Sequence, residues 1–440
     1  MSDNHPCESF ASAALAYART LACAAVEVMV EQRTTRISSW ESAAVLSAVT
    51  LAPQEKISMT VCAYRASGLS GRASGAVATE GAVRKLVDLA LKRAGEATPN
   101  EYAGPASRYP QVEQGLGLYD RRQPQLTDEA REDVVNSNIE DVRSVSGVEP
   151  LGFRYTEQVL HRRVLNSVGL DQFERSSRYT LWAQVKHDGN VIEQSVHSRH
   201  FADVASLPLG ADLAKQVARY ADPQDHEGGP VLLVLEPRAI AKLMAVVTTA
   251  FDRRLVEAGK SFLRDGRRVG SEKLHMVDDA RQFGGLQSRG FDDRGVPALD
   301  LPLIREGVVG ALYMTVEDAR FHDARPSGHE ASTSLWPGNL LLRCGTRSRN
   351  MMFPELGEFV ILDALVGDDQ SWFNIKTGAL RLTGHFFSSD SGSEPSYIGV
   401  RTIRTTFPEL WSGIQEIGND QQRFGFVDVS TWIVDGLSLE

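Results

Sequence analysis

Apolar residues in the first 220 positions recur at helical spacing in some segments and alternate with polar residues in others. Helical spacing predicts helices at 8–25, 83–94, 128–142 and 211–220. Thr127 directly precedes the third and is a suitable N-cap. Alternation predicts strands at 26–32, 43–51, 56–65, 152–166 and 177–187. Asp188-Gly189-Asn190 predicts a hairpin turn, and the small residues of 67–75 predict a loop.

A segment rich in Pro, Asp and Gly, 221–229, separates this pattern from a second one. Beyond it, GGPVLLVLEPRAIAKLM (228–244) predicts a strand that passes directly into a helix at Pro237. Short strands with Gly turns follow, among them 273–279, 307–314, 339–345 and 358–367. We therefore predict an α+β protein. Residues 1–222 form an α/β domain with an antiparallel sheet flanked by helices, and residues 223–440 form a sheet-rich, barrel- or sandwich-like domain.

Composition narrows the functional classes. With 42% hydrophobic and 24% charged residues the chain has the composition of a globular protein. A net charge of −10 without any basic cluster argues against general nucleic-acid binding. Arg19, Glu27 and Glu31 interrupt or close the early apolar stretch, and no window is long enough for a membrane helix. The four cysteines lack CxxC spacing. We expect a cytoplasmic protein that contacts neither nucleic acid nor membrane.

The chain contains two His-Glu pairs, His226-Glu227 and His329-Glu330, that match the first two residues of a zinc-peptidase helix motif. Such a helix needs a second His four or five residues after the first. Those positions hold Pro, Val, Thr and Ser, so both pairs fail. There is also no GxSxG elbow, no Walker loop and no cysteine in a catalytic context.

Other acidic and imidazole groups offer weaker candidates. His197 and His200 stand in an alternating segment, which turns them to opposite sides of a strand. Asp278-Asp279 and Asp292-Asp293 are paired carboxylates that can bind a metal, but adjacent strand residues also diverge. The preferred interpretation of both Asp pairs is exposed turns.

Several segments in order resemble the TldD/PmbA family, also called the modulator-of-gyrase family. They are GKSFLRDGRRVGSEKLHMVDDA (259–280), SRGFDDRGVPALDLPLIREGVVGALYM (288–314), SGHEASTSLWPGNLLLRCG (327–345) and IQEIGND (414–420). Asn339 resembles the family's Asn before a strand, and Gly418-Asn419-Asp420 resembles its Val-Gly-Asn-Asp element. RASGLSGRASG (65–75) and LNSVGL (165–170) extend the resemblance into the N-terminal half.

The resemblance implies a role in a two-subunit peptidase. In that family the TldD-like subunit carries HExxxH on the helix after the first strand of the C-terminal domain, with a late Cys as third zinc ligand. The TldE/PmbA-like subunit shares the fold without these ligands. Here that helix reads LEPRAIAKLM, Glu236 stands near the family's Glu, the next His is His275, and no Cys follows Asp420.

The resemblance therefore implies a TldE/PmbA-like subunit that is inactive alone and carries no catalytic residue, metal or cofactor. Its expected partner is a TldD-like subunit that bears HExxxH and zinc, and its expected substrate is a small or unfolded peptide. Contacts with substrate or partner are expected at His329, Glu330, Asn339, Asn419 and Asp420.

Two alternatives remain open. One is a specialised family member that makes or trims a peptide-like natural product at a nonstandard metal site. Its ligands would come from His197, His200, His329, His385 or the paired aspartates. The other is a homodimeric binding protein without a catalytic partner.

Overall fold

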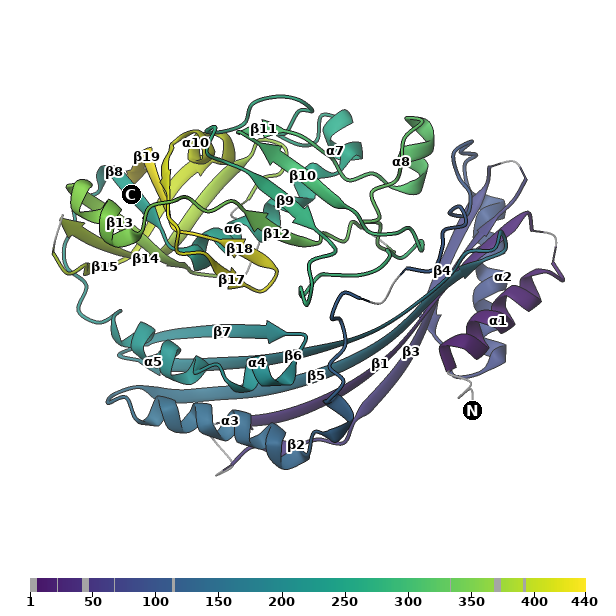
Figure 1. Ribbon diagram of the computed structural model, residues 1–440, viewed down its shortest axis with the longest axis horizontal. Helices are drawn as coiled ribbons and strands as arrows, with labels where there is room; N and C mark the ends of the chain where they lie inside the picture. Colours follow the sequence, from purple (N-terminus) through teal and green to yellow (C-terminus); the bar gives the residue numbers. More distant parts are fainter. Residues whose placement is uncertain are drawn as a thin grey trace.

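The computed structural model shows two sheet-rich halves stacked on one another. It describes residues 6–21, 23–41, 47–66, 68–112, 115–332, 334–367, 373–390 and 393–440. A long curved sheet forms the N-terminal half, and the C-terminal half lies on its concave side (Figure 1). No helix in the described part of the chain is long and apolar enough to cross a membrane.

The N-terminal half contains one antiparallel sheet of seven strands. Its order is β4-β3-β1-β5-β6-β7, with β2 paired to β1. β1, β5 and β6 span 17, 18 and 17 residues, which lets them carry the curved surface. The strands are β1 (Ala25–Glu41), β2 (Val49–Thr50), β3 (Gln54–Tyr64), β4 (Ser70–Ala76), β5 (Glu149–Asn166), β6 (Asp171–His187) and β7 (Asn190–Ser198).

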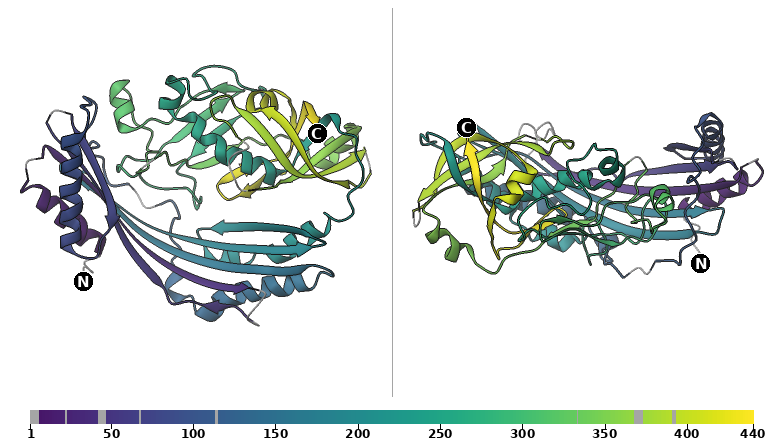
Figure 2. Two further views of the ribbon diagram at one scale, coloured as in Figure 1. Left: turned by 180° about the vertical axis from the view of Figure 1, so that it is seen from behind. Right: turned by 90° about the horizontal axis from the view of Figure 1, so that it is seen from above.

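Helices cover the convex face of this sheet. Val26, Val28 and Val30, alternate positions of β1, pack against the two N-terminal helices, and Tyr155 and Tyr179 pack under helices at the other end. Figure 2 shows α1 and α2 at the end of the sheet that lies away from the barrel. Because side chains alternate along a strand, the intervening positions face the C-terminal half. The helices are α1 (Pro6–Ala18), α2 (Glu80–Glu96), η1 (Gln123–Gln125), α3 (Asp128–Arg143), α4 (Phe201–Ala205) and α5 (Leu209–Ala218).

The C-terminal half contains a closed barrel and a second sheet. One six-stranded sheet has the order β15-β14-β13-β8-β19-β16, and pairing of Ile403 with Leu439 joins β15 to β19 and closes the ring. The other sheet has the order β11-β10-β9-β12-β18-β17. The strands are β8 (Gly229–Leu235), β9 (Met276–Asp279), β10 (Asp300–Arg305), β11 (Val308–Val309), β12 (Asn339–Leu342), β13 (Glu358–Leu365), β14 (Ala379–Asp390), β15 (Ser396–Thr406), β16 (Ile414–Ile417), β17 (Gln422–Phe424), β18 (Val427–Val429) and β19 (Trp432–Leu439).

A single large core joins these two sheets. Ile240, Leu243 and Met244 of α6 are fully buried in it, together with Trp411 and Trp432. The helices of this half are α6 (Pro237–Val247), η2 (Thr248–Phe251), α7 (Arg253–Glu257), α8 (Val316–Phe321), α9 (Arg349–Met352), η3 (Phe353–Glu355) and α10 (Phe407–Ser412). The predicted α+β class, with a helix-flanked antiparallel sheet and a barrel-like C-terminal half, is confirmed. The predicted boundary after residue 222 lies between the end of α5 and the start of β8.

Local turn and cap predictions match the structure at two points. Asp188 and Gly189 have φ angles of 45° and 82°, as a tight hairpin turn between β6 and β7 requires. Thr127 accepts a hydrogen bond from the Ala130 backbone at 3.2 Å and caps α3.

The loop predicted for residues 67–75 is wrong from Ser70 onward, because Ser70–Ala76 forms strand β4. Its small residues serve packing rather than turning. A Cβ at Gly71 would lie 2.2 Å from both the Ala90 carbonyl and the Ala94 nitrogen of α2. Glycine lets the helix approach the strand this closely.

The first helix is also shorter than predicted, and the following strand is longer. α1 ends at Ala18, and Ala25 pairs with Tyr64 in the sheet. Alanine favours helices, but sheet pairing overrides that propensity here. The strand predicted at 43–51 lies partly in 42–46, outside the described residues, and only Val49–Thr50 of the remainder is a strand.

Buried arginines connect the two halves. Arg294 donates from Nε to Glu27 of β1, from Nη1 to Glu330 at 3.0 Å, and from Nη2 to the Tyr64 hydroxyl at 2.9 Å and the Gly104 carbonyl at 2.8 Å. Only 3% of both Glu27 and Arg294 is exposed. The ion pair is therefore dry, and it ties the sheet to the C-terminal half.

Arg162 of β5 makes a second connection. Its guanidinium carbon lies 4.6 Å from the Phe291 ring centroid and 4.7 Å from that of Trp336. It donates to Asp293 at 3.1 Å and to the Phe291 carbonyl at 2.5 Å. Arg199, after β7, adds a third contact through Nη2 to the Leu286 carbonyl at 2.6 Å. These contacts set the spacing of the halves and so the shape of the space between them.

Candidate functional site

A groove of about 700 Å³ lies between the two halves of the molecule. The concave side of β6 and β7 forms one wall, with Arg178, Gln184 and the 191–197 segment. The exposed face of α6, the end of β13 and the turn between β17 and β18 form the other. The groove is thus bounded by elements from both halves.

Helix α6 places the α6 groove face, defined as Arg238, Ala241, Lys242 and Ala245, along this space. β8 runs into the helix at Glu236, which has an extended backbone, and Pro237 occupies the first turn. The predicted strand-to-helix junction is confirmed. The other side of α6 is apolar and buried, so the helix cannot rotate to present a different face.

The α6 groove face does not fit a zinc ion. Zinc requires thiolate, imidazole or carboxylate donors, whereas this face presents two cationic side chains and two methyl groups. Glu236 beside it is held by Arg349 through hydrogen bonds of 2.7 and 2.5 Å. Among the residues that the structure describes, no three His, Cys, Asp or Glu side chains are placed to share a metal ion.

Two histidines line the groove from opposite walls. His197 of β7 hydrogen-bonds through Nδ1 to the Thr180 hydroxyl at 2.9 Å. His385 of β14 bonds to the Tyr397 hydroxyl at 2.9 Å and stacks on Tyr220 with ring centroids 3.8 Å apart. Burial lowers the pKa of each imidazole to about 4. Both are therefore neutral at physiological pH.

Because of the lowered pKa values of these two histidines, we predict that the free energy of unfolding falls in acid. Their ordinary pKa is 6.5, so lowering it in the folded state makes protonation favour the unfolded chain. Their contribution is fully present above about pH 6.5 and is lost as the pH falls toward about 4. Urea unfolding across this range should show a weaker pH dependence for a His197→Gln/His385→Gln variant than for the natural chain. Imidazole NMR titrations with midpoints near 6.5 would contradict the assignment.

Strand β7 gives the groove an open sheet edge. It is the last strand in the order of its sheet, and β6 is its only strand partner among the residues that the structure describes. Val191, 49% exposed, lies on this strand and lines the groove. An extended peptide can add to such an edge through backbone hydrogen bonds.

Three of the five predicted contact residues are inside the protein. His329 is fully buried and bonds to the Ser327 carbonyl at 2.8 Å and to Asp278 at 3.1 Å. Glu330, 9% exposed, accepts from Arg294. Asn339, 2% exposed, accepts from the Gln287 backbone at 2.9 Å. Each side chain organises the protein's own loops in this structure.

The other two predicted residues are nearer the surface. Asn419 is exposed, and its amide donates to the Thr346 carbonyl at 3.4 Å. Asp420 is half-buried and accepts from the Thr431 hydroxyl at 2.6 Å. A contact of either residue with a substrate or partner remains a prediction.

The exposed-turn interpretation of the aspartate pairs is wrong. Asp278 has no exposed surface, and it accepts hydrogen bonds from Tyr313 at 2.5 Å and from the Gly338 backbone. Asp292, 1% exposed, accepts from the backbone of Arg294 and Glu330. These carboxylates organise loops that bring distant segments together, and such partners are not visible in a local pattern.

Sequence reasoning did not identify the positively charged α6 groove face or the interdomain arginines as site-forming. The spacing of Arg238 and Lys242, four residues apart on a helix with a buried opposite side, was available as a signal. No sequence signal indicated the burial of Arg162, Arg199 and Arg294, because arginine is normally exposed.

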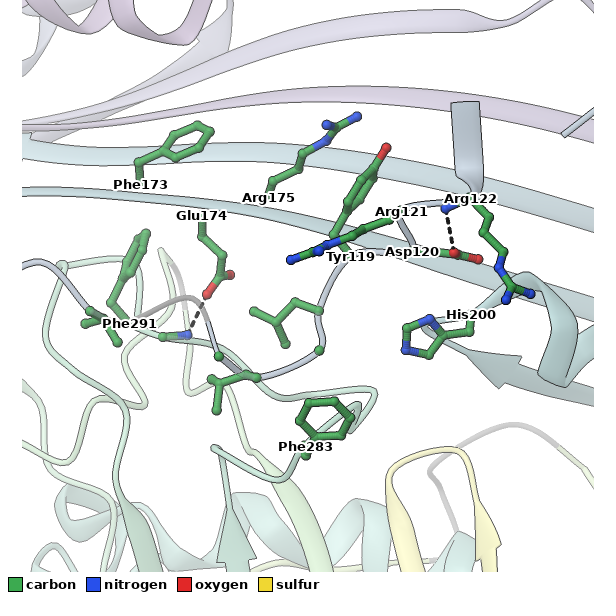
Figure 3. Close-up of a pocket in the computed structure, with 16 residues that line it drawn as sticks. Tyr119, Asp120, Arg121, Arg122, Phe173, Glu174, Arg175, His200, Phe283 and Phe291 are labelled. Carbon is green, nitrogen blue, oxygen red and sulfur yellow. Dashed lines mark hydrogen bonds between the residues drawn. The ribbon is translucent and has the colours of Figure 1, made fainter. Parts of the chain in front are cut away.

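A second pocket, of about 730 Å³, shares the 283–291 loop with the groove and is drawn in Figure 3. The 115–122 segment, the start of β6 and the 283–291 loop line it. Arg121, Arg122 and Arg175 are among its lining residues, and the Arg175 guanidinium lies beside the Tyr119 ring. Phe283, 74% exposed, stands at its edge.

Comparisons with known proteins agree with this fold. Residues 228–440 match the PmbA/TldA metallopeptidase C-terminal domain. Metalloprotease PmbA of Escherichia coli O157:H7 is 22% identical over 264 residues. That match covers 58% of this chain and 57% of the relative, less than two thirds of the relative's length.

Three crystal structures share the fold along nearly the whole chain. A proposed modulator of DNA gyrase from Bacteroides thetaiotaomicron has a TM-score of 0.87 and 15% identity, with 99% of each chain covered. One from Thermotoga maritima has a TM-score of 0.85 and 20% identity, covering 98% of this chain and 100% of the other. TldE from Thermococcus kodakarensis has a TM-score of 0.81 and 18% identity, covering 98% and 99%.

The C-terminal half of the chain therefore has the fold and sequence of a metallopeptidase-family domain. Residues 228–440 belong to the PmbA/TldA metallopeptidase C-terminal domain family, and the whole chain shares its fold with the three crystal structures.

Proposed function

We propose that this chain is the TldE/PmbA-like subunit of a two-subunit peptidase that cleaves or matures small peptides in the cytoplasm. A TldD-like partner supplies the zinc ion on its HExxxH helix and breaks the peptide bond. This chain supplies one wall of the peptide channel and is inactive alone. Four unpaired cysteines fit a reducing compartment.

The α6 groove face carries the proposal. It lies on the helix after the first C-terminal strand, where a zinc-bearing relative is expected to have its ligands. Arg238 donates to Gln216, and Lys242 donates to the Gly367 carbonyl at 2.5 Å. The α6 groove face thus has side chains that hydrogen-bond within the protein, where a zinc-bearing relative is expected to have zinc ligands.

The groove suits an extended peptide. The edge strand β7 has no strand partner on its outer side in the described part of the chain, and backbone pairing is insensitive to side-chain identity. The two groove histidines stay neutral, so they act as hydrogen-bonding groups rather than charges. These features support weak sequence selectivity for an unfolded substrate.

Co-expression with an HExxxH-bearing homologue from the same cell tests the proposed function. We expect a stable complex that hydrolyses fluorescein-labelled casein and carries about one zinc ion. Zinc should disappear when the partner's first motif His is changed to Ala, and it should persist in a His197→Ala/His385→Ala variant of this chain. Stoichiometric zinc on the isolated chain, or casein hydrolysis by it, would overturn the assignment.

Filling the groove should inactivate the complex without separating it. Ala245 lies on the α6 groove face and is half-buried, so an Ala245→Trp side chain projects into the peptide path. We expect kcat/KM for casein peptides to fall by at least about tenfold, with co-elution of the subunits unchanged. Val168→Trp is the control, because Val168 is 51% exposed at the β5–β6 turn. Equal activity of the two variants would exclude the groove as the peptide path.

A further inference from the structure

The second pocket has a charge pattern that the proposed subunit role does not use. Arg121 and Arg122 are exposed, and in the described part of the chain their guanidinium groups make no ion pair or hydrogen bond. Arg175 lies 3.7 Å from the Tyr119 ring centroid, and its Nε is buried without a hydrogen-bond partner. Arg121 and Arg122 therefore bring guanidinium groups with available donors to the pocket, and Arg175 is stacked on Tyr119 behind them (Figure 3).

The carboxylates in the same pocket do not neutralise these arginines. Asp120 accepts from the Arg122 backbone at 2.9 Å and from the Phe201 backbone at 3.0 Å. Glu174 accepts from the Gly290 backbone at 2.5 Å and from Arg162 at 3.4 Å. Both carboxylates are held by donors of the protein itself. Within the described residues, neither carboxylate is hydrogen-bonded to the guanidinium group of Arg121 or Arg122.

Aromatic surface borders the charged part. Phe173, Phe283 and Phe291 line the pocket, and Phe283 packs over Gly117, whose φ angle of 66° brings the backbone under the ring. A ligand that carries a carboxylate beside an apolar group would match both parts. Arginine pairs with a carboxylate through two parallel hydrogen bonds, which a lysine cannot supply.

We propose that this pocket binds carboxylate groups of an acidic peptide, with Arg121 and Arg122 as the recognising residues. The pocket shares the 283–291 loop with the groove: Phe283 and Gly290 line the pocket, and Leu286 and Gln287 line the groove. An acidic segment held here leaves the rest of an extended chain beside the groove. The ligand class rests on the proposed function, but the binding itself requires only this chain.

Fluorescence anisotropy of the isolated full chain tests the pocket. The probe is fluorescein-labelled Gly-Leu-Glu-Glu-Leu-Gly with an amidated C terminus, and matched probes replace both Glu residues with Gln or Lys. A fourth probe keeps the Gln residues and a free C-terminal carboxylate, which separates side-chain from terminal carboxylate recognition. We expect the Glu probe to bind at least about tenfold more tightly than the Lys probe and to weaken as salt rises.

Variants then locate the binding. Arg121→Ala/Arg122→Ala should raise Kd for the Glu probe by at least about tenfold, and Arg121→Lys/Arg122→Lys should recover only part of that loss. The control is Arg84→Ala/Arg404→Ala, which removes the same charge from exposed sites with 60% and 62% side-chain exposure. Equal effects of the two alanine pairs, or equal binding of the Glu and Lys probes, would overturn the proposal.

These results separate the pocket from the subunit role. Binding of the Glu probe by the isolated chain needs no partner, whereas casein hydrolysis does. Loss of probe binding with an active complex refutes only the pocket, and probe binding without any complex refutes only the subunit role. Since Arg121 and Arg122 are exposed, their replacement should leave the thermal unfolding midpoint unchanged, which verifies that the variant is folded.

Discussion

Replacing Arg294 with Met is expected to lower the free energy of unfolding by about 3–5 kcal/mol, because it leaves buried carboxylates without a counter-charge. Glu27 and Glu330 both accept from this guanidinium, and Glu27 is 3% exposed. Urea unfolding followed by tryptophan fluorescence measures the loss. The curve should shift to lower urea with little change in slope.

A second substitution separates the charge from the packing. Glu27→Gln added to Arg294→Met removes one orphaned carboxylate, so the double variant should be more stable than Arg294→Met alone. Arg404→Met is the matched control. Arg404 pairs with Glu440 at the surface, so loss of this ion pair should lower the free energy of unfolding by about 1 kcal/mol or less. Similar losses for Arg294→Met and Arg404→Met would mean that the dry interdomain pair contributes little.

Asp278→Ala is expected to destabilise the chain by at least about 3 kcal/mol, because several buried donors lose their acceptor together. Tyr313 donates to it at 2.5 Å, and Gly338 donates its backbone N–H at 2.8 Å. His329 bonds to it at 3.1 Å. Asp278→Asn keeps one acceptor oxygen and should lose less. The urea midpoint again measures the effect.

A double-mutant cycle with His329→Gln decides what His329 does. If it is a structural partner of Asp278, the two substitutions should couple by about 0.5–3 kcal/mol. His329→Gln alone should also lower stability, since the imidazole has no exposed surface. A His329→Gln variant as stable as the natural chain, with weaker casein hydrolysis by the complex, would restore His329 as a substrate contact.

The proposed role as a metal-free subunit depends on the residues that α6 carries where zinc ligands are expected in a TldD-like subunit. On α6, Arg238 and Lys242 occupy the groove side, while Ile240 and Leu243 occupy the core side. A cationic wall attracts carboxylates and peptide carbonyls and repels a divalent metal ion. The same sign of charge recurs in the second pocket, where Arg121 and Arg122 are exposed. Both surfaces have the charge that the proposed acidic peptide would require.

Much of the fold could be predicted because the signals were local. Apolar periodicity located α3, and the capping hydroxyl of Thr127 located its start. Asp188-Gly189 marked the β6–β7 turn because few residue pairs tolerate two positive φ angles. The strand-to-helix change at Pro237 was equally local. The loop predicted around Gly71 was wrong. A glycine is needed there because α2 packs closely against the strand, and the neighbouring residues in sequence do not reveal that contact.

The sequence by itself determined the class of fold, the order of most elements and the absence of the HExxxH spacing, since these follow from periodicity and from residue type. The tertiary structure decided which polar residues are buried and which face a cavity. His329 and Asp278 became internal partners, and Arg121 and Phe283, far apart in sequence, came to line one pocket. The side chains of His329 and Asp278 are buried and hydrogen-bonded by segments that lie far away along the chain. A local sequence pattern therefore contains no information about the free energy of burying and pairing them.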